Sequence, residues 1–135
     1  MDGSSMSSDV VVVDDDPRVR ALTLHILQRA GLTVSAHESP LTALDLVLAH
    51  PPRVLLTDFA MPHLDGVGLA SAVRGGLGER SPRIMLLTGN PQSVRAKDKH
   101  LFDVILGKPW ESHVLVETVL PWVRASMPPL VAHAG

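Results

Sequence analysis

The sequence predicts an α/β fold, a three-layer sandwich in which a five-stranded parallel sheet carries helices on both of its faces. Two observations predict this fold. Short apolar runs alternate five times with longer segments of helical periodicity, the pattern of an open sheet whose strands are joined by right-handed crossovers. Three of the runs are apolar at consecutive positions, as expected for parallel strands that are covered on both faces.

The five apolar runs are the predicted strands. They comprise residues 10–13 (VVVV), 32–36 (LTVSA), 53–57 (RVLLT), 83–88 (RIMLLT) and 103–106 (DVIL). The first, third and fourth runs are the ones without alternation, whereas a sheet with one solvated face would alternate polar and apolar residues. These three runs are therefore expected to be buried on both faces.

The first two predicted helices have signals at both ends. Residues 17–30 place apolar side chains on one stripe, with Asp16 as the N-cap, a proline as the first helical residue and Gly31 as the stop. The next helix repeats this arrangement with Ser39 as the cap and a proline after it, and two prolines follow its end. Both segments are therefore expected to be helical.

Three more helices complete the predicted alternation. They run from about residue 64 to 73, from about 91 to 100, and from near Trp110 onward. Gly66 and Gly68 weaken the third helix, because glycine lowers helix propensity. In the fifth helix Pro121 removes a backbone hydrogen bond at a cost of about 3 kcal/mol, so we expect a kink or an early end near Leu120.

Length and composition predict one domain and exclude several classes of protein. A chain of 135 residues with a formal charge of -2 suits a single domain and has no basic field to attract nucleic acid or anionic lipid. Cysteine is absent, and no apolar run approaches the roughly 20 residues that cross a bilayer. We therefore expect a cytoplasmic protein without membrane insertion or direct contact with nucleic acid. The folded domain is expected at 9–126, between flexible tails at 1–8 and 127–135.

Reactive side chains follow four of the five predicted strands. The first strand ends at Asp14 and Asp15, the third at Asp58, the fourth at Thr88, and the fifth just before Lys108. Ligand chemistry in open α/β sheets gathers beyond the carboxyl ends of the strands. These side chains are therefore expected to converge at one edge of the sheet.

Three carboxylates at one edge need a compensating cation, because adjacent like charges resist burial. For Mg²⁺ (or Mn²⁺) we expect direct contacts from Asp15 and Asp58 and a water-mediated contact from Asp14. Thr88 and Lys108 would then serve phosphoryl oxygens, the electrostatic clamp on which phosphoryl transfer depends. Asp58 is a candidate nucleophile that would form an acyl phosphate.

Four short segments together resemble the receiver domain of bacterial response regulators. They are VVDDDPRVR, LLTDFAMPHLDG, IMLLTG and GKPW, in the same order and with similar spacing over about residues 9–125. The resemblance implies a flavodoxin-like fold with strand order 2-1-3-4-5 and a switch or relay in two-component signalling. It also implies that Asp58 accepts a phosphoryl group from the phosphohistidine of a sensor histidine kinase or a histidine phosphotransfer protein.

The same resemblance implies roles for further residues. The backbone carbonyl of Ala60 would be an additional Mg²⁺ ligand, and Pro109 matches the family's cis-proline after the site lysine. Ile105 stands where receivers usually carry an aromatic residue, so we expect an aliphatic switch or a different output surface. Such a domain is not an enzyme. It is a phospho-acceptor that assists its own phosphorylation and dephosphorylation and acts on an unknown downstream protein in trans.

Two other hypotheses compete with this interpretation. Asp14 and Asp16 also satisfy the Asp-x-Asp pattern of haloacid-dehalogenase-like phosphatases, with Asp14 as nucleophile and Asp16 as acid/base. No late acidic pair follows Lys108 and no segment remains for a substrate-selecting cap, and Asp16 is better explained as a helix cap. A degenerate scaffold without phosphate chemistry is opposed by the intact set of Asp14, Asp15, Asp58, Thr88 and Lys108.

Overall fold

The structure is a computed structural model that describes residues 8–126. Within this range the chain forms five strands, four α-helices and three short 3-10 helices. None of the described helices is long and apolar enough to cross a membrane. The predicted tails lie outside the described residues apart from Ser8, so the expected domain boundaries stay a prediction.

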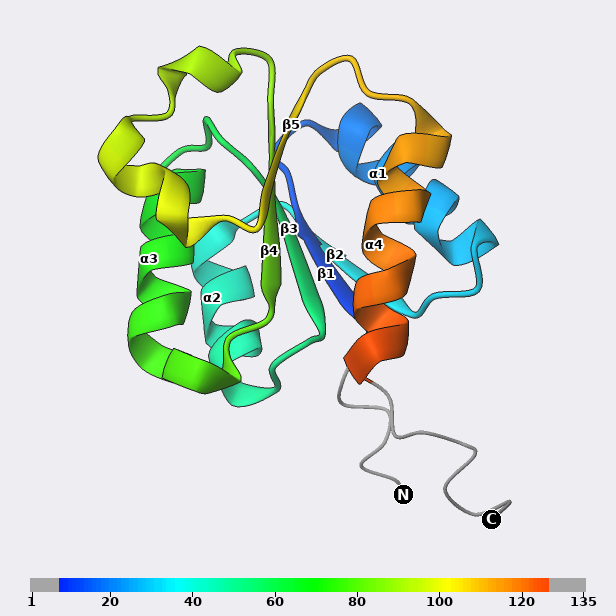
Figure 1. The fold of residues 1–135 in the computed structure, drawn as a ribbon, viewed down its shortest axis with the longest axis horizontal. Helices are drawn as coiled ribbons and strands as arrows, with labels where there is room; N and C mark the ends of the chain where they lie inside the picture. The colour runs from blue at the N-terminus through cyan, green and yellow to red at the C-terminus, as the bar shows by residue number, and fades with distance from the viewer. Residues whose placement is uncertain (1–7, 127–135) are drawn as a thin grey trace.

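The five strands form one parallel sheet in the order β2-β1-β3-β4-β5, which confirms the predicted fold class (Figure 1). They are β1 (Val10–Val13), β2 (Val34–His37), β3 (Val54–Asp58), β4 (Arg83–Thr88) and β5 (Val104–Gly107). Their bounds differ from the predicted ones by at most two residues. Because all the strands run in one direction, their carboxyl ends share one edge of the sheet, at the top of Figure 1.

Helices cover both faces of this sheet. α2 and α3 lie on one face, at the left in Figure 1, and α1 and α4 lie on the other. Their bounds are α1 (Pro17–Arg29), α2 (Pro40–Ala49), α3 (Gly66–Leu77) and α4 (Ser112–Ser126). The odd-numbered valines of β1 belong to the core under α2 and α3, and the even-numbered ones to the core under α1 and α4. All four are at most 1% exposed, so β1 is buried on both faces as predicted.

The ends of α1 and α2 follow the predicted signals. An oxygen of the Asp16 carboxylate accepts a hydrogen bond from the amide of Arg18 at 2.9 Å, and Ser39 Oγ accepts one from the amide of Thr42 at 3.3 Å. Each cap satisfies an amide that has no partner inside its helix. Gly31 follows α1 with a φ of 91°, a left-handed conformation that glycine adopts without strain.

α3 begins and ends later than predicted. It starts at Gly66, after its N-cap Asp65, and reaches Leu77 instead of ending near residue 73, and the 3-10 helix η2 (Gly78–Arg80) follows it. The helix buries four apolar side chains, those of Leu69, Ala70, Val73 and Leu77. Their burial against the sheet outweighs the low helix propensity of the glycines in this segment.

The prediction of an α-helix at about residues 91–100 is wrong. The connection between β4 and β5 contains two 3-10 helices instead, η3 (Pro91–Ser93) and η4 (Ala96–Leu101). Val94 and Leu101 anchor this connection in the core, and an α-helix anchored by both would also bury positions 97 and 98. Those positions are Lys97 and Asp98, whose charges resist burial.

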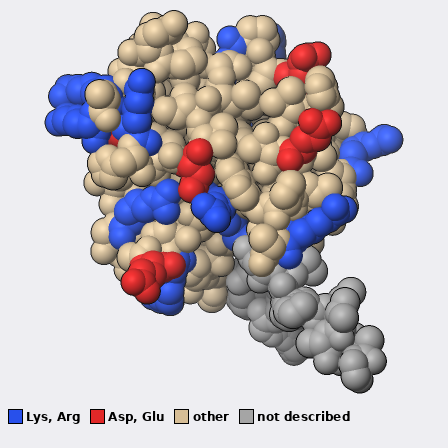
Figure 2. Space-filling view, viewed as in Figure 1, with Lys and Arg blue, Asp and Glu red and all other residues tan. Residues whose placement is uncertain are grey.

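Basic side chains gather at the upper left of the face shown in Figure 2, in the region of η4. The exposed basic residues in η4 and directly before it include Arg95, Lys97 and Lys99. Below η4, the Asp103 carboxylate binds Arg74 at 3.2 Å and Arg83 at 3.1 Å and accepts the amide of Ile84 at 2.8 Å. Burial alone would raise the pKa of Asp103, but these three donors together hold it below its ordinary value. Asp103 thereby ties the start of β5 to α3 and β4.

Of the kink or early end expected near Leu120 in the last helix, the early end is wrong. That helix is α4, and it continues through Pro121 to Ser126. Val119 and Val123 are buried on either side of the proline, whereas Pro121 itself is exposed. Packing of the neighbouring side chains therefore outweighs the hydrogen bond that proline cannot make.

Gly66 marks a close approach between α3 and β3. Its amide donates to the carbonyl of Phe59 at 2.8 Å. A Cβ at this position would overlap the carbonyl oxygen of Asp58 and lie 2.8 Å from Leu86 Cδ1. Only glycine therefore fits at the start of this helix without displacing the backbone next to Asp58.

We predict that Gly66→Ala lowers the free energy of unfolding by about 1–3 kcal/mol, because the added methyl group forces the backbone of β3 to move. Gly75→Ala on the same helix is the matched control. Nothing lies within 4 Å of its added Cβ, so the higher helix propensity of alanine should stabilise the protein by about 0.5–1 kcal/mol. Urea unfolding followed by circular dichroism measures both variants, and equal stability of the two would contradict this account of Gly66.

Candidate functional site

The three aspartates predicted to converge do lie together. Asp14 and Asp15 follow β1, Asp58 is the last residue of β3, and β1 and β3 are neighbouring strands. One carboxylate oxygen from each residue lies within 4.8 Å of the other two. The parallel sheet thus assembles residues that are distant in sequence into one group, the acidic cluster of Asp14, Asp15 and Asp58.

Lys108 brings a positive charge to the acidic cluster. Its Nζ lies 2.8 Å from Asp58 Oδ1 and 3.9 Å from Asp14 Oδ2. Lys108 follows β5, its backbone amide donates to the carbonyl of Thr88 at 2.7 Å, and its peptide bond to Pro109 is cis, as predicted. The lysine therefore reaches Asp58 from two strands away, and its ammonium group pairs with two of the three carboxylates.

Asp14 carries a buried oxygen without a hydrogen-bond donor. The residue is 2% exposed, and its Oδ1 accepts a bond from the amide of Asp16 at 2.9 Å. Its Oδ2 has no hydrogen-bond partner among the described residues. Burial raises the pKa of Asp14 above its ordinary value, and the charges of Asp58 and Asp15 add to this rise, against the lowering effects of the Asp16 amide and Lys108. The acidic cluster therefore holds more negative charge than Lys108 balances.

A divalent cation fits this arrangement. The three carboxylates supply oxygen ligands of the kind that Mg²⁺ prefers. The Asp14 oxygen that accepts no hydrogen bond is a buried acceptor that a cation, or a water molecule bound to a cation, would satisfy. The donor set present in the described residues therefore matches the predicted cofactor.

The other predicted site residues lie at the same edge or in the strand that leads to it. Thr88 ends β4 beside the strand of Asp58, is 3% exposed, and accepts the amide of Asn90 on its Oγ1 at 3.1 Å. Ala60 is exposed in the loop after β3, two residues beyond Asp58. Ile105 is half-buried in β5 and packs against the core under α2 and α3. Thr88 therefore ends at the same edge of the sheet as Asp58, and Ile105 lies in the neighbouring strand β5.

Asp16 caps α1 and lies outside the acidic cluster. It is exposed, and its carboxylate accepts the amide of Arg18. The grouping of carboxylates at the sheet edge comprises Asp14, Asp15 and Asp58 among the described residues. A phosphatase would need Asp16 as an acid/base beside Asp14, so the structure does not support the phosphatase alternative.

Two side chains without a motif signal hold the main chain at the site. Arg20 Nη1 donates to the carbonyl of Asp14 at 2.9 Å, and Thr57 Oγ1 donates to the carbonyl of Asp58 at 2.9 Å. Sequence reasoning missed both contacts. For Arg20 the one available signal was helix register, since side chains in the first turn of a helix point back toward the preceding loop. Thr57 lies in β3 and has no such signal.

An apolar groove of about 400 Å³ opens beside the acidic cluster, next to Lys108. It is lined by Val19, Leu22, Lys108, Pro109 and Trp110. Leu22 is 52% exposed, although it is a large apolar side chain. An exposed apolar surface of this kind is typical of a contact site for another molecule.

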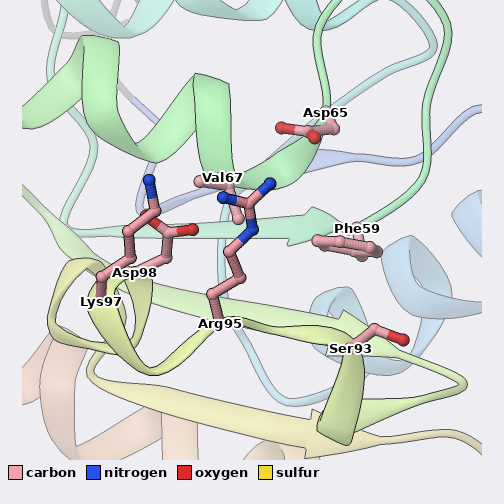
Figure 3. A pocket seen from close by; sticks show the side chains of 7 residues that line it. All are labelled: Phe59, Asp65, Val67, Ser93, Arg95, Lys97 and Asp98. Atoms are coloured by element: carbon pink, nitrogen blue, oxygen red, sulfur yellow. The ribbon is translucent and has the colours of Figure 1, made fainter.

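A second pocket, of about 300 Å³, lies between the start of α3 and the 3-10 helices (Figure 3). The side chain of Arg95 extends across it toward Val67 and Asp65, and Lys97 lies beside Asp98. Its two basic side chains are matched by two acidic ones, and Asp65 already caps α3 through a main-chain amide at 2.7 Å. None of the predicted metal or phosphate ligands lines this pocket.

Comparison with known proteins finds relatives over most of the chain. Residues 10–120 match the family model described as the response regulator receiver domain. A protein of Leptolyngbya boryana named "Uncharacterized 14.6 kDa protein in sodA1 3'region" is 33% identical over 122 residues, covering 89% of this chain and 93% of that protein. The transcriptional regulatory protein CseB of Streptomyces coelicolor is 30% identical over 93% of this chain and 51% of its own length. This chain therefore spans about half of CseB.

Solved structures show the same fold. The response regulator protein TrrA of Thermotoga maritima, in complex with Mg²⁺-BeF, matches with a TM-score of 0.76 and 25% identity. The match covers 84% of this chain and 96% of TrrA. The sequence and structural comparisons therefore agree on one family.

We predict that Asp14→Asn raises the free energy of unfolding by about 1 kcal/mol at pH 7 in metal-free buffer. The substitution removes a buried charge that lacks a donor, while the asparagine oxygen can still accept the Asp16 amide. The gain should shrink as the pH falls, because the raised native-state pKa lets wild-type Asp14 take up a proton above the ordinary value of 3.8.

Urea unfolding in EDTA at pH 7 and at mildly acidic pH measures this effect. Asp16→Asn is the matched control, since Asp16 is exposed and asparagine caps helices as well as aspartate does. Its stability should follow that of the wild type at both pH values. An Asp14→Asn variant that is less stable than the wild type at pH 7 would contradict the excess of negative charge inferred for the cluster.

Proposed function

This chain belongs to the response regulator receiver domain family, and from that premise we propose that Asp58 accepts a phosphoryl group from a phosphohistidine. The observation that carries the proposal is the 2.8 Å bond from Lys108 Nζ to Asp58 Oδ1 within the acidic cluster. A carboxylate nucleophile, a cation and a cation-binding group of acids are the parts that phosphoryl transfer to an aspartate needs. The domain is thus a phosphorylation switch of two-component signalling.

We propose Mg²⁺ as the cofactor, with Mn²⁺ as a substitute, held by Asp15 and Asp58 directly, by Asp14 through water and by the backbone carbonyl of Ala60. The unpartnered oxygen of Asp14 and the 4.8 Å grouping of carboxylates support this assignment. TrrA, which has the same fold, is known in complex with Mg²⁺-BeF. When bound, the ion would neutralise negative charge on the phosphoryl oxygens.

Asp58, Lys108 and Thr88 would each have a role in the transfer of the phosphoryl group. One oxygen of Asp58 attacks phosphorus while the bond from phosphorus to the imidazole nitrogen breaks, and the imidazole leaves with the bonding electrons and takes up a proton. Lys108 is close enough to Asp58 to bond the phosphoryl oxygens that arrive there. Thr88 Oγ1 accepts the Asn90 amide, so its own hydroxyl proton is available to a phosphoryl oxygen. The domain thus assists its own modification without turning over a separate substrate.

We propose that the donor is a sensor histidine kinase or a histidine phosphotransfer protein that docks on the apolar groove. Leu22 and Trp110 line the groove, and Lys108 belongs both to the groove and to the acidic cluster. A partner that buries Leu22 would therefore place its phosphohistidine near Asp58. Because binding would bury a large apolar side chain, the groove favours a protein as the phosphoryl donor over a small molecule.

We propose that Ile105 takes the place of the aromatic residue that receivers usually carry. Ile105 lies in β5 opposite Leu86, and two residues later Gly107 pairs with Thr88. A shift of Thr88 toward a phosphoryl group would displace the neighbouring strand β5, which ends next to Lys108 and Pro109. The side chain of Ile105 would then repack against the core under α2 and α3. A downstream partner would recognise the altered surface on that face.

We predict that Asp58→Asn abolishes phosphorylation by labelled acetyl phosphate in the presence of Mg²⁺, because an amide cannot form the acyl phosphate. Asp45→Asn, which changes an exposed carboxylate on α2, should label like the wild type. Borohydride reduction and peptide sequencing locate the label. Undiminished labelling of Asp58→Asn, or label on Asp14 in the wild type, would remove Asp58 as the acceptor.

We predict that Leu22→Asp slows transfer from a phosphorylated histidine kinase about tenfold, because burial of this leucine contributes roughly 1.5 kcal/mol to docking. The kinase is the one of a purified panel that transfers fastest to the wild type. Leu41→Asp is the matched control, since Leu41 is 50% exposed but lies on α2, on the other face of the sheet. Phosphorylation by acetyl phosphate should be unchanged in both variants, and equal kinase rates for the two would exclude the apolar groove as the docking site.

A further inference from the structure

Arg20 bonds to the main chain of the acidic cluster and, within the described residues, to no carboxylate. Its Nη1 donates to the carbonyl of Asp14 at 2.9 Å, and the side chain is half-buried on the first turn of α1. Hydrogen bonds from a charged donor are about twice as strong as neutral ones. This bond therefore holds the peptide group that joins Asp14 to Asp15 in one orientation.

Short bonds hold the rest of this loop. The amide of Asp14 donates to the carbonyl of His37 at 3.1 Å, and Asp14 Oδ1 accepts the amide of Asp16 at 2.9 Å. The amide of Arg20 donates to the carbonyl of Asp16 at 2.9 Å, so Arg20 is anchored to the loop that it holds. These bonds hold the main chain on both sides of Asp15.

Asp15 has no comparable support of its own. In the part of the chain that the structure describes, no hydrogen bond or ion pair holds its carboxylate. Its position within 4.8 Å of Asp14 and Asp58 is therefore set by its backbone. The peptide group before Asp15 sets the direction in which that backbone runs, and Arg20 holds this peptide group.

We propose that Arg20 is a positioning residue of the metal pocket, which aims the Asp15 carboxylate at the cation by holding the carbonyl of Asp14. The inference rests on the proposed function in one respect, that the acidic cluster binds Mg²⁺. Arg20 acts through the geometry of the main chain, in the way that outer groups orient the ligands of a metal.

Loss of the Arg20 guanidinium has two effects of opposite sign on Mg²⁺ affinity. A positive charge near the cluster repels Mg²⁺, so removal of the charge alone would tighten binding. Loss of the bond to the Asp14 carbonyl frees the peptide group before Asp15 and weakens binding. The direction of the change in affinity therefore distinguishes a positioning role from a purely electrostatic one.

The test is calorimetric titration of the full chain with Mg²⁺. Arg20→Met and Arg20→Lys should each weaken binding about tenfold, the lower end of the loss found when groups that orient metal ligands are removed. Arg18→Met is the matched control, because it removes the same charge from an exposed side chain on the same turn of α1. Its Kd should stay within about twofold of the wild-type value, since solvent screens an exposed charge.

A second measurement separates positioning from a general loss of structure. In an Asp15→Asn background, Arg20→Met should weaken Mg²⁺ binding by much less than in the wild type, because the ligand that Arg20 aims has already lost its charge. Urea unfolding shows whether each variant is folded. If Arg20→Met does not fold, Arg20→Lys, which keeps a long basic side chain, carries the test.

Two kinds of result would overturn the proposal. Mg²⁺ binding by both Arg20 variants that is as tight as in the wild type would exclude a positioning role, and so would equal losses in the wild-type and Asp15→Asn backgrounds. A wild-type chain that does not bind Mg²⁺ would overturn the proposed metal site and this role with it. Failure of the inference alone and failure of the proposed function are thus distinguishable.

Discussion

Three carboxylates lie together at the carboxyl edge of the sheet, and one ammonium group pairs with two of them. The rest of the structure depends on how this excess of negative charge is held. Asp14 is almost inaccessible to water, so its Oδ2 lacks the solvation that would otherwise compensate its charge. A chain that keeps such a group in its folded state favours the binding of a cation, because binding removes the cost of isolating the charge.

The parallel sheet supplies the rigid part of this arrangement. β1, β3 and β4 are buried along nearly their whole length, so the ends of these strands are poorly able to move apart. The loops that follow the strands need further support. Arg20 gives it to the loop after β1 through the Asp14 carbonyl, and the close packing at Gly66 gives it to the loop after β3.

Features that depend on near neighbours in the chain could be predicted from the sequence. Asp16 and Ser39 cap their helices because each side chain reaches an amide two or three residues away, whatever the rest of the chain does. The acidic cluster could also be predicted, because strand ends align in any parallel sheet. The segment around Lys97 and the helix around Pro121 could not, since their structures depend on which neighbouring side chains the core accepts.

The sequence by itself determined the alternation of strands and helices, the helix caps and the chemical groups that gather at the sheet edge. Those features follow from local pattern or from the general geometry of parallel sheets. Only the tertiary structure decided which oxygen of Asp14 lacks a partner, which carbonyl Arg20 holds and why position 66 has no room for a side chain. These properties depend on distances of a few ångströms between packed segments, and a pattern of residue types along the chain does not specify such distances.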